Sequence, residues 1–190
     1  MTREESNIDF GEIPGRSESG DPREGGESLA RRLTETLSRR SQTVAAAESC
    51  TAGLVADLFA RIPGASRVFW GSLVTYTLDA KVKILGLDRG ELERNGPVSG
   101  ETAGAMALGA LEKSGADYAV AVTGLAGPGG DGTAVPVGTV WIAAVGRDRI
   151  PAAYMFSFRG RRNEIREKAA LEALKILSKH AGSNGFPSPA

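Results

Sequence analysis

Strand patterns alternate with helix patterns along most of this chain, and that alternation restricts the fold more than any other feature. Strands are expected at residues 43–48, 67–77, 117–124, 138–146 and 152–160. Helical periodicity surrounds the first three strand patterns, whereas the last two are joined by a short connection and are expected to form a hairpin. This order predicts an α/β fold, a three-layer α/β/α sandwich with a mixed sheet.

Helices are expected on both sides of these strands. They are predicted at residues 27–42, 51–62, 78–87, 99–115 and 161–180. Residues 1–26 are rich in Gly, Glu, Arg and Ser, so we expect a disordered arm there, followed by one domain over 27–181 and a flexible tail at 182–190.

Composition excludes several classes of protein. The 190 residues suit one domain, and 23 basic residues balance 23 acidic ones, so no sequence-independent binding to nucleic acid is expected. The single Cys fits a reducing compartment, and the sequence shows neither an apolar run of membrane-spanning length nor a signal peptide. We therefore predict a cytoplasmic protein that binds neither membrane nor nucleic acid.

The chain has one histidine, His180, at the end of the last predicted helix. A Ser-His-Asp triad needs an oriented imidazole beside its nucleophile, and His180 is poorly placed for that role. One His and one Cys also make the usual zinc ligand sets improbable, so no metal is predicted. Any hydrolytic chemistry must use another base.

Ser49 lies between a predicted strand end and a predicted helix start, in "VAAAESCTAGLVADLFARI". Ligands in open α/β sheets bind at the carboxyl ends of strands, and free amides at a helix start suit a phosphate or an oxyanion. The amides near Cys50 and Thr51 are the candidates. The alternative is that Ser49 or Thr51 only caps the helix.

Two further segments carry candidate functional residues. In "VTYTLDAKVK", Tyr76 and Lys81 lie five residues apart, and a lysine can replace histidine as the base for a serine if burial keeps it neutral. The alternative is a strand aromatic and a solvated helix lysine. The Gly/Pro-rich stretch 123–139 lets backbone approach a ligand closely, or is simply a flexible connection.

Basic residues precede the last helix in "FRGRRNEIR", which contains Arg159, Arg161, Arg162 and Arg166. They are candidates for a phosphate clamp, because arginine binds phosphate through two parallel hydrogen bonds. A solvated helix start is the alternative.

Five blocks occur in order: "AESCTAGLVADLFARIPGAS", "GSLVTYTLDAKVKILGL", "GPVSGETAGAMALGA", "ADYAVAVTGLAGPGG" and "PVGTVWIA". Together they resemble the CinA C-terminal domain family over about residues 27–180. The resemblance implies a mainly parallel, mixed five-stranded sheet. It also implies an activity without metal or cofactor, the hydrolysis of nicotinamide mononucleotide (NMN) to nicotinate mononucleotide and ammonia.

The same resemblance implies roles for individual residues. Ser49 corresponds to the family's nucleophile, with Lys81 as base and Tyr76 as a positioning or relaying group. The implied substrate-binding residues are Glu48, Cys50, Thr51, Thr123, Gly124, Gly127, Gly129, Arg162 and Arg166. A homodimer or larger assembly is also implied.

Three departures from the family pattern concern this site. Ala52 replaces a glycine, Leu78 and Asp79 replace Asn and Glu, and Arg161 replaces an aspartate. Ala52 is costly if the position needs a positive φ and favourable if it lies within a helix. A catalytically inactive nucleotide-binding module in competence or DNA-damage responses, and an amidase for another amide, are the alternative functions.

Overall fold

The computed structural model describes residues 8–11 and 21–182. Its elements, in chain order, are β1 (Asp9–Phe10), α1 (Pro22–Arg39), β2 (Val44–Glu48), α2 (Leu54–Ala60), η1 (Ala65–Arg67), β3 (Phe69–Val74), α3 (Leu78–Leu85), α4 (Arg89–Asn95), α5 (Gly100–Ser114), β4 (Tyr118–Gly124), β5 (Thr139–Gly146), β6 (Ala152–Ser157) and α6 (Arg162–Gly182).

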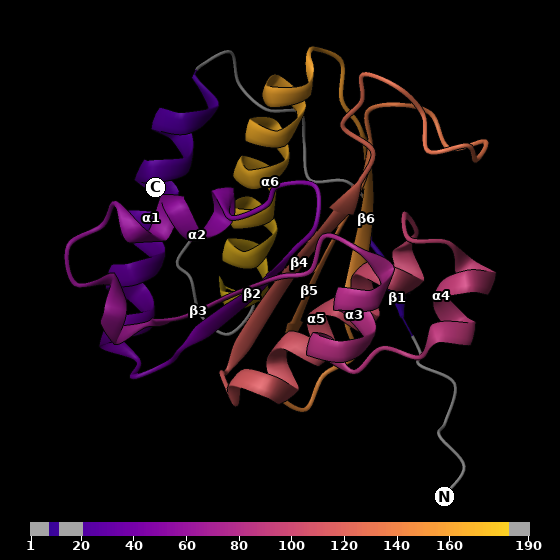
Figure 1. Cartoon of the computed structure of the whole chain (residues 1–190). Coiled ribbons are helices and arrows are strands. Elements are labelled where there is room, and N and C mark those ends of the chain that lie inside the picture. The colour runs from indigo at the N-terminus through magenta and orange to yellow at the C-terminus, as the bar shows by residue number, and fades with distance from the viewer. Residues whose placement is uncertain (1–7, 12–20, 183–190) are drawn as a thin grey trace, which may run out of the picture.

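The strands form one mixed sheet between two helical layers. Its strand order is β1-β6-β5-β4-β2-β3, and β5 is antiparallel to both of its neighbours while the other pairs are parallel. Helices α1, α2 and α6 cover one face and α3, α4 and α5 cover the other (Figure 1). The predicted three-layer α/β/α class is therefore confirmed.

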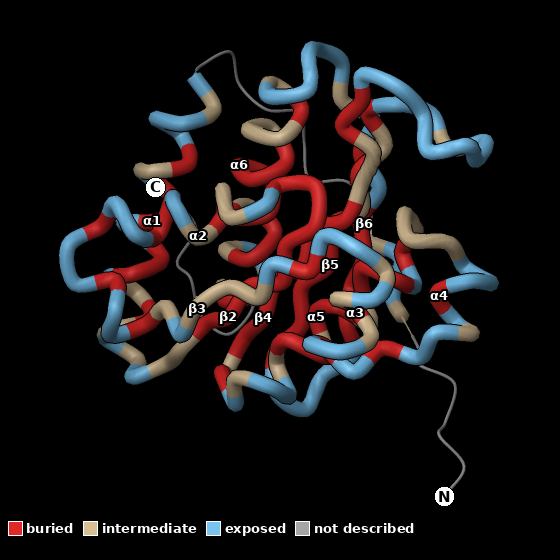
Figure 2. Tube along the Cα trace, viewed as in Figure 1, coloured by how far each residue is buried: buried red, intermediate tan, exposed pale blue. Residues whose placement is uncertain are grey.

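Small side chains let the layers approach closely in the centre of the sheet. Strands β2 and β4 are buried along nearly their whole length (Figure 2). Val120 and Val122 belong to the core beneath α1 and α6, whereas Ala119 and Ala121 belong to the core beneath α5. Alternation of this kind is what a strand buried on both faces requires.

Several details differ from the sequence predictions. The sheet has a sixth strand, β1, and α1 begins at Pro22, so residues 9–10 and 22–26 of the predicted disordered arm have regular structure. Residues 1–7 and 12–20 of that arm and residues 183–190 of the predicted tail lie outside the described residues. The short helix α4 was not predicted, although Asp88 caps it by accepting the Glu91 amide at 2.9 Å.

Within residues 8–11 and 21–182, no helix combines the length and the apolar character needed to cross a membrane.

Candidate active site

Ser49 follows β2 directly and begins a tight turn. The Ala52 amide donates to the Ser49 carbonyl at 3.1 Å, and Ala52 and Gly53 have φ angles of 50° and 99°. These left-handed residues cannot continue into a right-handed helix, so α2 begins only at Leu54. The sequence prediction of a helix from residue 51 was therefore three residues early.

Glu48, rather than Ser49 or Thr51, satisfies the start of α2. Its carboxylate accepts the amides of Gly53, Val55 and Ala56 at 2.9, 3.1 and 3.0 Å. It also accepts the Ser72 hydroxyl at 2.8 Å and is fully buried. The predicted capping role of Ser49 or Thr51 is wrong. Both Glu48 oxygens accept hydrogen bonds within the fold, and its contact with substrate stays a prediction.

Lys81 reaches Ser49 from α3. Its Nζ lies 3.0 Å from Ser49 Oγ and donates to the Thr75 carbonyl at 2.7 Å. Thr77 begins α3 by accepting the Ala80 amide at 3.1 Å, which places Lys81 one turn into the helix and facing the sheet. The prediction that Ser49 and Lys81 form a pair thus agrees with the geometry.

Burial makes this lysine a usable base. Lys81 is only 1% exposed, and no carboxylate in the described part of the chain forms an ion pair with it. Desolvation therefore lowers the pKa of Lys81 from 10.5 to about 8. About a tenth of the amine is then neutral at pH 7, with a lone pair available to accept the Ser49 proton, and the neutral fraction rises with pH.

A cavity of about 280 Å³ opens beside the two side chains. The predicted site residues that line it are Ser49, Cys50, Tyr76, Lys81, Thr123, Gly124 and Arg162. Glu48, Thr51, Gly127, Gly129 and Arg166 do not line it. The carboxyl ends of β2 and β4 and the loop before α5 therefore build the site together.

Pro97 and Val98 also line this cavity, and sequence reasoning gave them no role. The Thr123 hydroxyl donates to the Pro97 carbonyl at 2.6 Å and so fixes the loop before α5 against β4. The only sequence signal for these residues was their position inside the block "GPVSG".

Tyr76 lies at the opening of the cavity and not between the base and the nucleophile. It is 53% exposed, and its hydroxyl accepts from Arg162 Nη2 at 2.6 Å. Arg162 also donates to the Gly127 carbonyl, so it links three separate segments around the opening. The structure thus brings Tyr76 to the site but does not place its hydroxyl in contact with Ser49 or Lys81.

Arg166 reaches the turn after Ser49 from α6 and does not pass through the cavity. Its Nε donates to the Cys50 carbonyl and its Nη2 to the Thr51 carbonyl, both at 2.9 Å. Arg166 does not line the cavity, and its contact with the substrate phosphate stays a prediction.

Cys50 has the environment of a core residue. It is 5% exposed, and burial raises the pKa of its thiol to about 11. A thiol with so high a pKa holds little thiolate at neutral pH and is a poor nucleophile. Of the two adjacent candidates, the geometry favours Ser49.

The departures from the family pattern lie mostly outside the cavity. Arg161 is exposed and pairs with Glu164 at 3.0 Å, and Asp79 pairs with Lys83 at 2.9 Å on the surface. Leu78 does line the cavity. Ala52 has a positive φ, so the costly alternative for that position holds.

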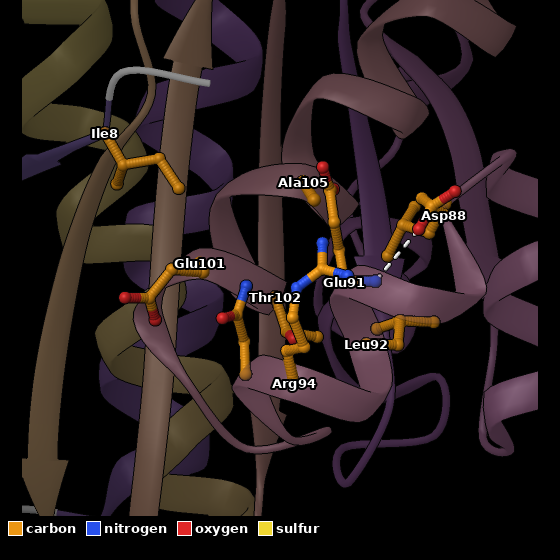
Figure 3. Close-up of a pocket in the computed structure, with 10 residues that line it drawn as sticks. Ile8, Asp88, Glu91, Leu92, Arg94, Glu101, Thr102 and Ala105 are labelled. Atoms are coloured by element: carbon orange, nitrogen blue, oxygen red, sulfur yellow. Dashed lines mark hydrogen bonds between the residues drawn. The ribbon is translucent and has the colours of Figure 1, made fainter. Parts of the chain in front are cut away.

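A second cavity, of about 210 Å³, lies between α4, the start of α5 and Ile8 (Figure 3). Two of its polar side chains serve the fold: Asp88 caps α4, and the Thr102 hydroxyl donates to the Gly96 carbonyl at 2.7 Å. This cavity contains no nucleophile paired with a base. No group of three or more possible metal ligands occurs within the described residues.

The fold and this site together define an α/β/α domain with a buried Ser–Lys pair at the carboxyl edge of its sheet. The chain belongs to the CinA C-terminal domain family, whose model matches residues 26–181.

Solved relatives share the whole fold. The structure of a competence-damaged protein (CinA) superfamily protein from Escherichia coli matches with a TM-score of 0.82 at 30% identity, over 89% of this chain and 95% of the other. A competence/damage inducible protein, CihA, from Agrobacterium tumefaciens matches with a TM-score of 0.78 at 39% identity, over 90% and 98% of the two chains.

Curated relatives are longer than this chain. A CinA-like protein from Desulfotalea psychrophila is 42% identical over 156 residues, which make up 81% of this chain and 37% of the relative. A CinA-like protein from Geobacter metallireducens is 43% identical over 80% of this chain and 37% of its own length. The chain thus spans well under half the length of the curated relatives that it matches.

Proposed function

We propose that this protein is a metal-independent amidohydrolase that converts NMN and water into nicotinate mononucleotide and ammonia. The observation that carries the proposal is the 3.0 Å contact between Ser49 Oγ and the buried amine of Lys81. A protein that only bound nucleotides would not require a lysine amine held against a serine hydroxyl, and desolvating that amine costs stability. The choice of NMN rests on the family resemblance.

The reaction follows from the geometry in two stages. Neutral Lys81 takes the proton of Ser49 while Oγ attacks the carboxamide carbon. The π electrons of the C=O bond move to the carbonyl oxygen, which becomes the oxyanion. Lys81 then gives its proton to the amide nitrogen, the C–N bond breaks and ammonia leaves. Water, deprotonated by Lys81, attacks the acyl-serine, and the ester bond breaks to release the carboxylate and restore Ser49.

The oxyanion would be bound by backbone amides of the turn after Ser49. Within the described residues, neither the Cys50 amide nor the Thr51 amide donates to an acceptor of another residue, and Cys50 lines the cavity. Amide donors held in place before the reaction stabilise developing charge more than water does.

Arg162 is the candidate for the substrate phosphate. It is exposed at the opening of the cavity, on the side of Tyr76, and an incoming phosphate could replace its bond to the Tyr76 hydroxyl. Asp131 also lines the cavity and is a candidate acceptor for a ribose hydroxyl. Tyr76 would then position Arg162 and the substrate, in place of the relay role expected from the sequence.

The proposal is tested by ammonia release from NMN in the presence of a chelator. We expect release by the native protein and by Lys83→Ala, a matched control because Lys83 lies on the same helix and is 72% exposed. Ser49→Ala and Lys81→Ala should each reduce release by about 10³-fold or more. No release by the native protein while NMN still binds would favour the catalytically inactive nucleotide-binding module.

Cytoplasmic location and assembly into a homodimer or larger oligomer stay predictions. Val68 is 1% exposed and belongs to the core, whereas Trp70 on edge strand β3 is 51% exposed. Light scattering during size-exclusion chromatography measures the assembly state directly.

A further inference from the structure

Arg166 projects from α6 onto two successive carbonyls of the turn that follows the nucleophile. Its Nε and Nη2 donate to the carbonyls of Cys50 and Thr51, and its Nη1 donates to Asn163 Oδ1 at 3.1 Å. No carboxylate among the described residues forms an ion pair with it. Its planar, forked donor group is therefore committed to backbone, which is an unusual use of an arginine near a site for an anionic substrate.

These two contacts determine where the neighbouring amides point. In a trans peptide group the C=O and the N–H lie on opposite sides. Arg166 holds the Cys50 carbonyl toward α6, so the Thr51 amide of the same peptide group points away from α6. The Ser49 carbonyl accepts the Ala52 amide, which likewise turns the Cys50 amide outward from the turn.

The turn needs this external support. Ala52 is held at a φ of 50°, a left-handed conformation that is unfavourable for an L-residue, and the glycine after it is also left-handed. A contact that fixes two of its carbonyls offsets the tendency of this turn to relax. The positive charge of Arg166 also polarises both peptide groups, which strengthens the amides as donors.

We infer that Arg166 is a positioning residue that builds the oxyanion-binding site beside Ser49. Its contact with the Cys50 carbonyl fixes the Thr51 amide, and its contact with the Thr51 carbonyl fixes the Ala52 amide, whose bond to the Ser49 carbonyl in turn orients the Cys50 amide. The inference rests on the proposed amidohydrolase function. It assigns Arg162 and Arg166, one helical turn apart, to different tasks: Arg162 lines the cavity, whereas Arg166 acts through the backbone.

Steady-state kinetics with NMN separates positioning from substrate binding. We expect Arg166→Met to lower kcat by about 10²- to 10³-fold with KM changed by less than about threefold, as for loss of oxyanion stabilisation. Arg166→Lys, which can reach one carbonyl, should lose less. Arg161→Met, a matched change at an exposed arginine paired with Glu164, should keep native kinetics. A raised KM with native kcat, or no change at all, would overturn the inference.

A second measurement needs no substrate and so separates failure of this inference from failure of the proposed function. In ¹H–¹⁵N spectra of the free protein, Arg166→Met and Arg166→Lys should move or broaden the Cys50 and Thr51 amide resonances, while Arg161→Met leaves them in place. Unchanged Cys50 and Thr51 resonances in both Arg166 variants would refute the positioning role, even if NMN is hydrolysed. Should the native protein leave NMN intact, the proposed function fails, and the same spectra still decide whether Arg166 orders the turn.

Discussion

Replacing Lys81 with Met should abolish hydrolysis and yet change stability in a way that depends on pH. Lys81 is 1% exposed and burial lowers its pKa from 10.5 to about 8. Below about pH 8 both the folded and the unfolded chain carry the proton on Lys81, so burial of the ammonium group lowers the free energy of unfolding. Between about pH 8 and 10.5 only the unfolded chain stays protonated, and the native protein therefore gains stability as pH rises.

The size of the effect follows from the shift. A pKa lowered from 10.5 to about 8 corresponds to about 3 kcal/mol in full. Between about pH 6.5 and about pH 9.5 the folded group loses its proton almost completely while the unfolded group is still largely protonated, which recovers about 2 kcal/mol of that amount. In Lys81→Met this contribution is absent, whereas every other titrating group is shared.

Urea unfolding, followed by the fluorescence of Trp70 and Trp141, gives the free energy of unfolding of both proteins at each pH. The difference between native protein and Lys81→Met should move by about 2 kcal/mol in favour of the native protein over that pH range. Loss of the contacts to Ser49 and Thr75 shifts the difference by a constant and does not change its slope. A difference that stays flat with pH would show that Lys81 is not a lysine with a lowered pKa, and would remove the basis for its role as base.

Four further outcomes follow from the site. If Lys81 is the base, kcat/KM for NMN should rise with pH to a plateau with an apparent pKa of about 8, and a profile flat from about pH 6 to 9 would contradict this. Glu48→Gln should lower Tm by about 5–12 °C in thermal denaturation, because a buried charged acceptor of three amides and a hydroxyl is lost. The control Glu93→Gln, at an exposed position, should keep the native Tm. A native Tm for Glu48→Gln would refute the capping role of Glu48. Ala52→Gly should leave urea stability unchanged or raise it by up to about 1 kcal/mol, because relief of the left-handed φ outweighs the added chain entropy, and a loss of that size would argue against the strain. Cys50 should react with a thiol reagent at pH 8 only after urea unfolding, because the thiol is buried and its pKa is raised. The Cys50→Ala variant should stay active. Fast labelling of the folded protein, or loss of activity in Cys50→Ala, would make Cys50 a candidate nucleophile again.

The layers of this fold could be predicted because local sequence and global structure agree over most of its length. The strands of β2 and β4 consist of small and β-branched residues that suit burial on both faces, and Ser99 and Gly115 bound α5 as their residue types indicate. Strand β1 could not be predicted, because two residues in a polar stretch carry no periodicity of their own. Its pairing with β6 depends on an edge that only the folded sheet provides.

The site shows where sequence reasoning reaches its limit. Residue types made Ser49, Lys81 and Arg162 candidates, and the family resemblance implied their roles. Neither showed what each residue touches, because those contacts join segments 32 and 86 residues apart. Serine is a favoured N-cap residue, so the sequence predicts that Ser49 caps the helix that follows it. Glu48 takes that task from a position inside the strand, which ordinary capping rules do not consider. Since Glu48 satisfies the start of α2, the Ser49 hydroxyl has no capping role that competes with its contact to Lys81.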